Sequence, residues 1–394
     1  MSPEVESGTA TRGRPPTPTP LEIAFHIDQL WFSSPGGIGT YVWELGSTLM
    51  GRDDIRLRTV RTRWRDDPQR AWFQDPDDAL VMPYPARLAF AGWAVLRRPR
   101  LPRALATARV VHAPNPATIP PAAPGQSLVV TIHDLAFEHE PQAFPDRWLR
   151  LYRRGLSIAR DEAAAVLVPS SFVAGELAGR GFAADRVHVV PLAGRPAPVP
   201  APTLAAEAVV EGLGVPTPYV VSVGTLEPRK NLARLVRAYR DAVRSASLSH
   251  ALVLAGHPGW RTRDLDVAIA EDGPGTVVRI ERATDLELDA LYRAADAVAY
   301  VSLSEGFGMP LLEAMSRGTP VVLSSTTSMP EVAGDAAVLV DPTDPAAIAD
   351  ALVSVLTDPA LADDLRRRGL ARAAMFGWDR TSDGTVDVYR RVVG

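Results

Sequence analysis

The chain has 394 residues, of which 46% are hydrophobic and 22% are charged, with a formal net charge of -4 and no cysteine. This length exceeds one ordinary hydrophobic core and predicts two globular domains, and the composition excludes a disordered protein. The missing cysteines exclude disulfides and thiolate metal sites and fit a reducing cytoplasm, and the net charge argues against nucleic-acid binding. No apolar run reaches the ~18 residues of a transmembrane helix.

The chain begins with a segment typical of disorder. Residues 1–20 are rich in Ser, Thr and Pro and lack the apolar stretch of a signal peptide, so we expect a disordered leader. From Leu21 on, short β-branched runs alternate with amphipathic helical segments, which is the pattern of parallel α/β architecture. The expected strands are 21–27, 55–60, 108–113, 127–132, 164–170 and 187–192, and then 219–225, 251–256, 277–282, 297–302, 320–325 and 336–341.

These strands form two sets separated by a proline-rich stretch. We expect two doubly wound parallel-sheet domains, Rossmann-like, at 21–195 and 216–376, joined by a linker at 196–215. The final segment, 377–394, is a predicted amphipathic helix that either closes the second domain or crosses back to the first. In open parallel sheets, ligands bind beyond the carboxyl ends of the strands, so the loops that follow strands are the places to search.

Three glycines follow the first expected strand. Gly36, Gly37 and Gly39 precede an amphipathic helix, and glycine lets a ligand come close to the backbone. The pattern half-matches a dinucleotide-binding fingerprint, but its third glycine is missing and the stretch 28–35 replaces the required tight turn. The loop is therefore a candidate for phosphate contact, with an ordinary flexible loop as the alternative.

A basic and aromatic segment spans 85–103. Its arginines are accompanied by Phe90, Trp93 and Leu96, and no acidic residue occurs between Asp78 and Asp134. We hypothesise peripheral contact with anionic lipid at the inner face of the membrane. The alternative is a helix packed inside the first domain with its arginines in solvent. The arginines concerned are Arg87, Arg97, Arg98, Arg100 and Arg103.

Two polar residues follow the strand expected at 127–132. His133 and Asp134 would project from its carboxyl end into a cleft between domains. His139 lies six residues further on, and this spacing without another clear ligand is a poor zinc pattern. A histidine that is hydrogen-bonded locally is the alternative interpretation of His133.

The loop after the strand at 219–225 contains the only lysine in the chain. Gly224 and Thr225 end this strand, and Arg229 and Lys230 stand just before the next helix, where their charges add to its positive N-terminus. A protein that otherwise uses arginine has kept one compact ammonium group here, which favours an anion-binding role. The alternative is a solvated basic turn.

The stretch "SLSEGFGMPLLEAM", residues 302–315, combines two carboxylates with a helix start. Gly306 and Gly308 allow close approach to the backbone, and Pro310 suits the first turn of a helix, which attracts anions. Because carboxylates repel phosphate, Glu305 and Glu313 are better suited to accept hydrogen bonds from hydroxyls. A phosphate between two hydroxylated groups describes a nucleotide sugar; a structural turn is the alternative.

Together these loops resemble the retaining glycosyltransferases of family 4, which have the GT-B fold of two Rossmann-like domains facing a central cleft. The resemblance runs from about Leu21 onward. It is carried by "EGFGMPLLE" (the E-x7-E motif), "VGTLEPRKN", "PGGIGTYV", the "HD" after the fourth expected strand, "PVVLSSTTSMPEVAGDAA" and a closing "WDRT". It implies an acceptor-side N-terminal domain and a nucleotide-sugar-binding C-terminal domain.

The resemblance implies a role for each loop. Lys230 with Arg229 would neutralise the donor diphosphate. Glu313 would hold the ribose hydroxyls, Glu305 would face the transferred sugar, and His133 would line the reaction centre. The implied catalytic residues are His133, Arg229, Lys230 and Glu305, and the implied donor-binding residues are Gly36, Gly37, Gly224, Thr225, Arg229, Lys230, Glu305, Gly306, Phe307, Gly308, Met309, Leu312 and Glu313.

The sequence departs from the family pattern in two places. The glycine usual after the strand at 277–282 is absent, so the region 279–282, which would lie against the base, leaves the base open. Thr225 stands where many relatives carry an arginine, so Arg229 would take over part of that charge.

The resemblance also implies the reaction. We expect a cytoplasmic enzyme that moves a hexose, with GDP-mannose the favoured donor and UDP sugars the alternative, to a lipid-linked or glycan acceptor with retention of configuration. We expect no metal and no further cofactor, because the DxD strings at 75–77 and 264–266 have the look of chance matches. The alternatives are a phosphorylase or epimerase on the same scaffold, a Rossmann oxidoreductase, which its incomplete fingerprint disfavours, and a nucleotide-sugar-binding subunit without activity.

Overall fold

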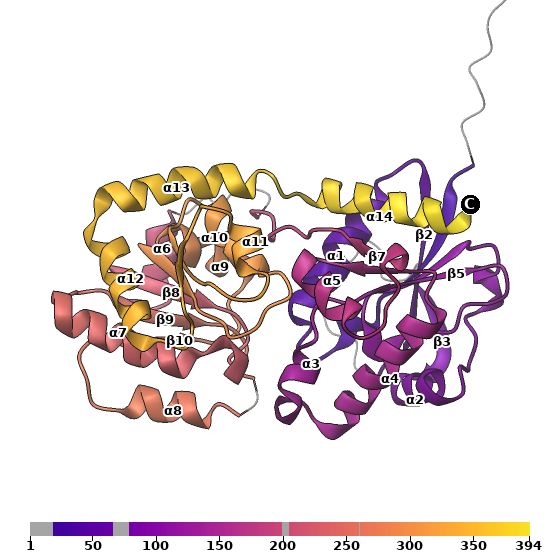
Figure 1. The fold of residues 1–394 in the computed structure, drawn as a ribbon, viewed down its shortest axis with the longest axis horizontal. Helices are drawn as coiled ribbons and strands as arrows, with labels where there is room; N and C mark the ends of the chain where they lie inside the picture. The colour runs from indigo at the N-terminus through magenta and orange to yellow at the C-terminus, as the bar shows by residue number, and fades with distance from the viewer. Residues whose placement is uncertain (1–18, 66–78, 199–204, 260) are drawn as a thin grey trace, which may run out of the picture.

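Two Rossmann-like α/β domains lie side by side, each built on a parallel sheet with helices on both faces (Figure 1). The structure is a computed structural model, and it describes residues 19–65, 79–198, 205–259 and 261–394. The predicted leader, except for its last two residues, and the DxD string at 75–77 lie outside the described residues. All strand pairs within the two sheets are parallel.

The N-terminal sheet has the strand order β3-β2-β1-β4-β5-β6-β7. The six strands expected in this half are present, but the sequence missed β3, a six-residue edge strand with prolines at positions 83 and 85. Proline cannot donate to a neighbouring strand, so it hides an edge strand from pattern analysis. The strands are β1 (Leu21–His26), β2 (Ile55–Arg63), β3 (Leu80–Pro85), β4 (Val110–Ala113), β5 (Ser127–Thr131), β6 (Ala165–Val168) and β7 (Val187–Val189); the helices are α1 (Gly36–Met50), α2 (Ala86–Val95), α3 (Ala136–His139), α4 (Asp146–Glu162) and α5 (Ser171–Ala178).

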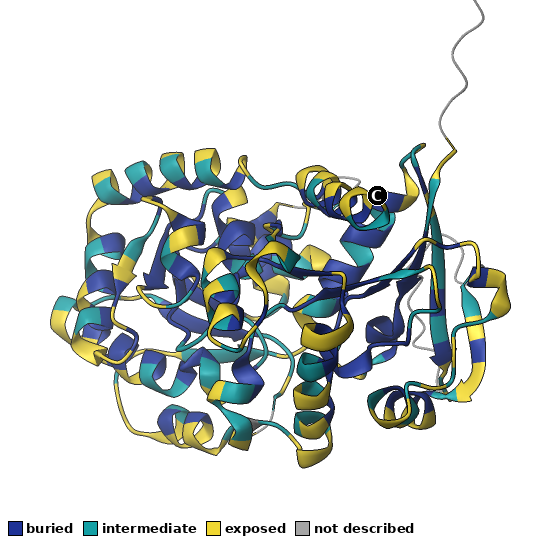
Figure 2. Ribbon diagram, turned by 45° about the vertical axis from the view of Figure 1, so that its right-hand side comes forward, coloured by how far each residue is buried: buried dark blue, intermediate teal, exposed yellow. Residues whose placement is uncertain are grey.

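The C-terminal sheet has the order β10-β9-β8-β11-β12-β13, and its six strands are those expected from the sequence. Its central strands are buried along their whole length and its edge strands only partly, because helices cover both faces of a doubly wound sheet (Figure 2). The strands are β8 (Tyr219–Val223), β9 (Ala251–Ala255), β10 (Val277–Ile280), β11 (Ala297–Tyr300), β12 (Val321–Ser324) and β13 (Val338–Val340); the helices are α7 (Leu232–Ala246), α8 (Arg263–Ala270), α9 (Asp285–Arg293), α10 (Met309–Ser316), α11 (Met329–Ala333), α12 (Pro345–Thr357) and α13 (Pro359–Ala373).

The chain crosses between the domains twice. The stretch expected to be a linker, 196–215, contains the helix α6 (Ala206–Gly212), which packs against α9, so it is not extended throughout. The last helix, α14 (Trp378–Val393), lies on the N-terminal domain beside α1, β5 and β6 (Figure 1). Thr381 Oγ1 donates to the carbonyl of Pro191 over 2.8 Å, and Ser127 Oγ donates to that of Val392 over 2.7 Å.

Length and apolar composition suit none of the described helices, taken singly, to crossing a membrane. One bent pair, Pro345–Thr357 with Pro359–Val393, meets both criteria when its two parts are counted together.

Candidate functional site

The carboxyl ends of the two sheets face each other, and the predicted loops meet across the domain boundary. A methyl group added to Gly306 would lie 1.8 Å from the carbonyl oxygen of His133, and one added to Gly37 would lie 2.8 Å from Cε of Met309. The backbone contact at Gly306 leaves room only for glycine, whereas the Met309 side chain at Gly37 can move aside. Two pairs of loops that are far apart in the sequence therefore touch at one place between the domains.

The lysine loop is a short 3-10 turn held from behind by its neighbours. It spans η7 (Pro228–Lys230), and Asn231 follows in a left-handed conformation with φ of 60°. The Asn231 amide donates to the carbonyl groups of Val301 and Pro342, which fixes the turn against the ends of β11 and β13. The Lys230 side chain is therefore presented from a rigid support, in a hollow that Gly224 and Ser302 also line.

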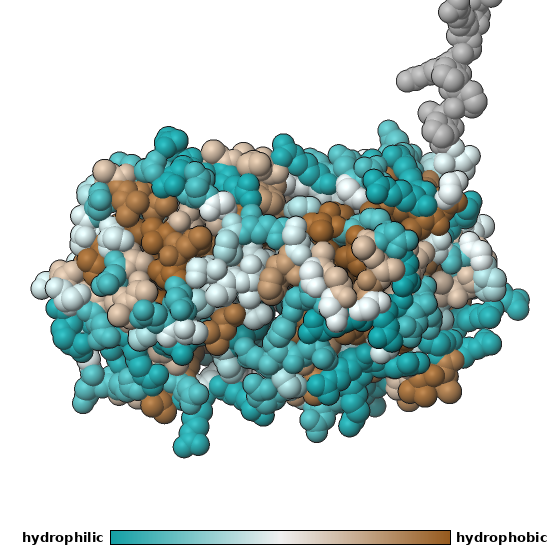
Figure 3. All heavy atoms as spheres, in the orientation of Figure 1, coloured by the Kyte–Doolittle hydropathy of each residue, from teal (hydrophilic) through white to brown (hydrophobic). Residues whose placement is uncertain are grey.

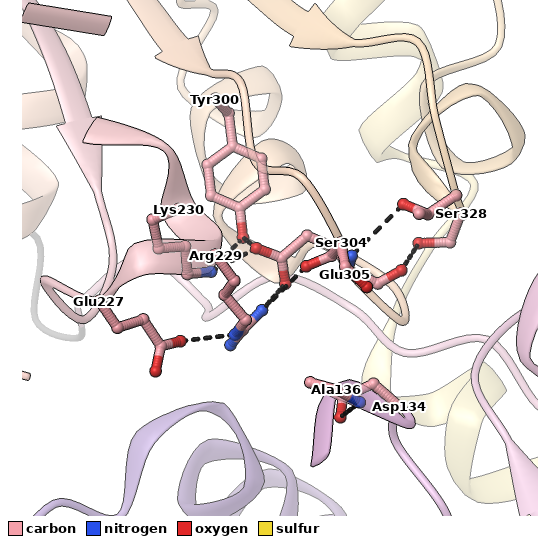
Figure 4. A network of polar contacts seen from close by, with 10 residues as sticks. Asp134, Ala136, Glu227, Arg229, Lys230, Tyr300, Ser304, Glu305 and Ser328 are labelled. Atoms are coloured by element: carbon pink, nitrogen blue, oxygen red, sulfur yellow. Dashed lines mark hydrogen bonds and ion pairs between the residues drawn. The ribbon is translucent and has the colours of Figure 1, made fainter. Parts of the chain in front are cut away.

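Lys230 and Glu305 form a buried ion pair (Figure 4). Lys230 Nζ lies 2.5 Å from Glu305 Oε1 and donates to Tyr300 Oη over 2.8 Å. Tyr300 Oη in turn donates to the same carboxylate oxygen over 2.8 Å. Lysine has three donor hydrogens, so one remains for another acceptor. The solvated-turn alternative is wrong for Lys230, which is only 8% exposed.

Arg229 takes the other oxygen of the same carboxylate. Its Nη1 lies 2.7 Å from Glu305 Oε2 and also donates to the carbonyl of Ser304, and its Nε lies 2.5 Å from Glu227 Oε1 (Figure 4). Glu305 thus binds both cations of the lysine loop, which is a contact that the sequence did not reveal.

Burial and charge act against each other in this cluster. Burial alone would raise the pKa of Glu305, but the charges and hydrogen bonds of Arg229 and Lys230 outweigh it and hold that pKa at about 2. Burial lowers the pKa of Lys230, an effect that the Glu305 carboxylate opposes. A carboxylate held ionised beside one buried and one half-buried cation is a preorganised charge arrangement typical of functional sites.

The loop between β11 and α10 ends in an open helix start. Gly308 has φ of 93°, stands at the N-cap of α10 and has no side chain to cap it; Pro310 follows in the first turn, as expected. Ser328 Oγ donates to the carbonyl of Glu305 over 2.9 Å, which holds the loop from the side of α11. The uncapped N-terminus of α10 therefore lies in the same loop as Glu305 and is free to bind an anion.

Glu313 lies in α10, eight positions after Glu305 in the sequence, and makes hydrogen bonds that do not involve Glu305. Tyr292 Oη donates to its Oε2 over 2.9 Å, and the backbone N–H of Arg195 donates to its Oε1 over 3.2 Å. The guanidinium of Arg195 also reaches Asp285 and Thr40, which lie in opposite domains. The first crossing of the chain between domains is therefore attached directly to the predicted ribose-binding carboxylate.

On the N-terminal side, the glycines belong to the helix and do not precede it. We expected Gly36, Gly37 and Gly39 before the helix, but α1 begins at Gly36, and Pro35 is its N-cap. Gly36 has φ of 59°, which glycine alone adopts without strain. The N-terminal turn of the helix itself, at Gly37, therefore faces Met309.

His133 lies at the domain boundary, as predicted, and is also hydrogen-bonded locally, as in the alternative interpretation. Its Nε2 donates to the carbonyl of Pro114 over 3.0 Å, so it is hydrogen-bonded locally, and its backbone abuts Gly306 in the opposite domain. The ring of Tyr41 packs against it with 4.7 Å between centroids. Burial lowers the pKa of His133 to about 4, so the ring is neutral near pH 7 with a lone pair on Nδ1.

Other predicted residues support the site from behind or lie beside it. Phe307 and Leu312 are buried in the apolar core, and Gly224 lies against the Lys230 side chain. Thr225 stands in the loop between β8 and η7. In the region 279–282, Arg279 pairs with Asp266 at 2.6 Å.

The segment 85–103 does not present its aromatic residues to a membrane. Phe90 and Trp93 are buried in the N-terminal core, and Arg97 binds Glu162 and the carbonyl of Ile119. The packed-helix alternative is therefore right for the two aromatic residues, whereas Arg97 is bound by the protein and does not lie in solvent. The sequence could not separate them from their neighbours because α2 is apolar around most of its circumference.

Several site residues escaped the sequence analysis. Tyr300, Glu227 and Arg195 bind the predicted residues directly, and Ser170 and Glu331 join the two domains beside them. Tyr300 was visible as the last residue of the strand before Glu305, and Glu227 and Glu331 stand within the motifs that carry the family resemblance. Among the described residues, no three His, Cys, Asp or Glu side chains gather in a way that could hold a metal ion.

Comparisons with known proteins agree with this geometry. The model of group 1 glycosyl transferases matches residues 207–372, and that of glycosyltransferase family 4 matches residues 35–193. The chain is 33% identical to O-antigen chain mannosyltransferase B of Escherichia coli over 269 residues, which cover 67% of this chain and 70% of that protein. It is 35% identical to D-inositol 3-phosphate glycosyltransferase of Salinispora arenicola over 195 residues, or 46% of this chain and 43% of that one.

Solved structures agree on the fold. HepE of Anabaena, solved in complex with UDP and glucose, superimposes with a TM-score of 0.71 at 19% identity over 94% of this chain and 100% of that one. WaaG, a glycosyltransferase involved in lipopolysaccharide biosynthesis, superimposes with a TM-score of 0.68 at 18% identity over 93% and 99%. The chain belongs to glycosyltransferase family 4, has the GT-B fold, and is a glycosyltransferase.

Proposed function

We propose that the protein is a retaining hexosyltransferase that transfers mannose from GDP-mannose without a metal ion. The observation that carries the proposal is the buried cluster of Arg229, Lys230 and Glu305, which lies beside the open start of α10 and opposite His133. The cluster holds two cations in fixed positions, with Glu305 and Glu227 as their counter-charges, where a diphosphate leaving group would develop negative charge.

The donor diphosphate would lie between the lysine loop and the start of α10. The third hydrogen of Lys230 and the uncapped first turn of α10 are the donors available to it. Because these groups are held in place by Tyr300 and Asn231, little reorganisation is needed as the bond breaks.

The two glutamates would hold the two ends of the donor. Glu313, with Tyr292 and the backbone of Arg195 as partners, would accept the ribose hydroxyls. Glu305 would accept a hydroxyl of the transferred sugar with the lone pair of Oε2 that Arg229 leaves unused. A pKa of about 2 for Glu305 ensures that it accepts and does not donate.

In the transfer step, the bond from the anomeric carbon to the diphosphate oxygen would break while the acceptor oxygen forms its new bond on the same face. The acceptor proton would pass to the departing phosphate oxygen. Attack on the face that the leaving group vacates would preserve the anomeric configuration. His133, neutral and oriented by Pro114, would line the sugar side of this centre. Closure of the domains through Gly306 would exclude water and suppress hydrolysis.

The sugar and the base rest on different observations. Mannose is supported by the likeness to O-antigen chain mannosyltransferase B, whereas UDP is the nucleotide found in HepE. We would titrate the protein calorimetrically with GDP, UDP, ADP and dTDP, with and without magnesium. We expect GDP to bind best and magnesium to make no difference; a preference for UDP would overturn the assignment of the donor.

The product would then distinguish transfer from the other reactions of this scaffold. With GDP-mannose and a mannose-terminated acceptor, we expect a new glycosidic bond with the anomeric configuration of the donor, as read by NMR. Sugar 1-phosphate formed with inorganic phosphate would indicate a phosphorylase, and an isomerised sugar would indicate an epimerase. Nucleotide binding without turnover of any donor would indicate a binding subunit.

A peripheral membrane site would bring a lipid-linked acceptor to the cleft. Apolar side chains gather on the solvent side of α2 and β3 (Figure 3), where Leu88, Val95 and Leu96 are 66%, 73% and 72% exposed. Arg87, Arg98 and Arg100 are exposed beside them. Exposed apolar residues beside cations are suited to the headgroup region of an anionic membrane, which supports the proposal that the protein binds at the inner face of the cytoplasmic membrane.

Liposome co-sedimentation tests this site with variants of its exposed residues. Leu88, Val95 and Leu96 changed together to Ser should abolish binding to anionic vesicles, and Arg98 with Arg100 changed to Ser should weaken it. Leu370 and Met375, exposed apolar residues of the C-terminal domain, provide the matched control when changed to Ser. Binding that survives the triple change, or no binding by the unchanged protein, would sink the membrane hypothesis and favour a soluble glycan acceptor.

A further inference from the structure

A series of buried, hydrogen-bonded hydroxyl and imidazole groups links α14, β4, β5 and α1 in the N-terminal domain. Tyr389 Oη, on α14, lies 2.6 Å from Nδ1 of His112 on β4. His112 Nε2 lies 2.8 Å from Oγ1 of Thr131, the last residue of β5. Thr131 Oγ1 lies 2.9 Å from Oη of Tyr41 on α1. All four side chains are buried, so three hydrogen bonds join α14 to its neighbour α1 by way of the central strands β4 and β5.

These groups stay neutral near pH 7. Burial, with a smaller effect from His133, lowers the pKa of His112 to about 3, and burial raises the pKa values of Tyr41 and Tyr389. None of the three therefore gains or loses a proton under ordinary conditions. Hydrogen bonds between neutral buried groups fix geometry, and removal of one partner leaves the other unsatisfied.

The series of hydrogen-bonded groups ends beside His133. The ring of Tyr41 packs edge-on against the ring of His133, with an interplanar angle of 77°. Thr131 is two residues before His133, and His112 is two residues before Pro114, whose carbonyl accepts from His133 Nε2. The ends of β4 and β5 are thus cross-linked twice, once by the buried chain and once by His133 itself.

We propose that Tyr41 is a positioning residue for His133, and that the chain from Tyr41 through Thr131 and His112 to Tyr389 anchors α14 at the atoms that orient the His133 ring. The inference rests on the proposed function, which gives His133 its place on the sugar side of the reaction centre. α14 is the segment by which the C-terminal domain returns to the N-terminal one, so its seat and the His133 orientation depend on the same hydrogen bonds.

Kinetics of hydroxyl-deletion variants provide the first test. Tyr41→Phe keeps the ring but removes the hydrogen bond to Thr131, and we expect kcat to fall about tenfold while the donor KM stays within about twofold. Tyr389→Phe should lower kcat less, and the double variant should be no worse than Tyr41→Phe, because both changes break one chain. Additive effects of the two changes would overturn the coupling.

Tyr239→Phe is the matched control. Tyr239 is buried in the C-terminal domain, and its hydroxyl donates to the carbonyl of His250 over 2.7 Å. Its change should lower stability, as loss of any buried hydrogen bond does, and leave kcat unchanged. If all three variants lower kcat equally, the effect of Tyr41 is structural only and the proposal fails.

Imidazole nitrogen NMR gives a readout that does not require the transfer reaction. In the unchanged protein, with its signal assigned through His133→Gln, we expect His133 to carry its proton on Nε2 and to stay neutral down to about pH 4. In Tyr41→Phe and Tyr389→Phe, its signals should shift and its pKa should rise. Unchanged His133 signals in both variants would overturn the proposal, whereas shifted signals would support it even if no donor were turned over. If Tyr41→Phe does not fold, Thr131→Val and Tyr389→Phe serve the same test.

Discussion

The two walls of the cleft differ in kind. The C-terminal wall carries charge, with Arg229, Lys230 and Glu305 locked together by ion pairs of 2.5 and 2.7 Å. The N-terminal wall carries fewer charges where it faces them, since it consists of the glycine turn of α1, of His133 in its uncharged form and of Asp134, whose carboxylate acts on Arg229. The difference indicates a division of work, in which one wall binds the anionic donor and the other provides shape and orientation.

The walls are joined by contacts that involve few charges. Ser170 Oγ donates to the carbonyl of Gly306 over 2.7 Å, and the Glu331 carboxylate accepts from the first backbone N–H groups of α5 at 2.8 and 3.2 Å. Both contacts link the loop or helix beside the donor site to the N-terminal domain. We therefore expect changes in the charged wall to affect donor binding and chemistry, and changes at the junction to affect chemistry more than nucleotide binding.

The largest expected effect is that of Lys230→Ala. The change removes the only ammonium group from a buried site and leaves Tyr300 and Glu305 without it. We expect kcat/KM to fall by about 30- to 1000-fold, or about 2–4 kcal/mol of transition-state stabilisation, as measured with the best donor.

Lys230→Arg is the matched control, because it keeps the charge and changes the shape. It should retain more activity than alanine but less than the unchanged protein, since a planar guanidinium does not fit the hollow beside Gly224. Turnover by Lys230→Ala within a factor of two of normal would remove Lys230 from the site.

Gly306→Ala tests the meeting point of the two walls. The added methyl would lie 1.8 Å from the His133 carbonyl oxygen and 2.9 Å from Cβ of Asp134, so the walls would have to separate. We expect transfer to fall about 100-fold while nucleotide affinity, measured by calorimetry, changes only a few-fold. Gly212→Ala, where nothing lies within 4 Å of the added methyl, is the control. An active Gly306→Ala variant would mean that this contact is absent during the reaction.

Glu331→Ala should have a smaller effect of the same type. The change removes a carboxylate that caps α5 from the opposite domain, and a helix cap contributes about 1 kcal/mol. If that energy favours the closed arrangement, kcat should fall about fivefold, with little change in nucleotide affinity. Asp344→Ala removes a comparable cap within one domain, at α12, and should lower stability only. Equal kinetic effects of the two variants would show that Glu331 is merely a cap.

The difference between the walls also explains how far the sequence could be interpreted. The proximity of Arg229, Lys230 and Glu305 was predicted, because each of their loops follows a strand of strong pattern and carries its polar residues within a few positions, as from Glu305 to Glu313, and the structure brings these residues together. The pairing of Glu305 with Lys230 was not, because it depends on two loops 75 positions apart in the chain. On the N-terminal wall, Tyr41 resembled any apolar helix residue, and its contact with His133 follows from the three-dimensional packing alone.

The smallest expected effect is a pH dependence of the free energy of unfolding, which arises from two histidines of the N-terminal domain. The pKa values of His112 and His133 in the folded protein are about 3 and about 4, below their ordinary value of 6.5. The unfolded chain therefore takes up protons between pH 6.5 and 4 that the folded chain does not, so the free energy of unfolding is highest above pH 6.5 and falls as the pH drops through this window. Glu44 opposes this trend, because burial raises its pKa to about 7.

A comparison of variants separates these contributions. His112→Gln removes one of the two histidines, so its free energy of unfolding should depend less steeply on pH, by on the order of 1 kcal/mol between pH 7 and pH 5. Urea unfolding followed by tryptophan fluorescence measures this, since most tryptophans lie in the N-terminal domain. His139→Gln, at an exposed histidine paired with Glu176, is the matched control variant. If both variants change the pH dependence of the free energy of unfolding equally, the buried neutral state of His112 is not its cause.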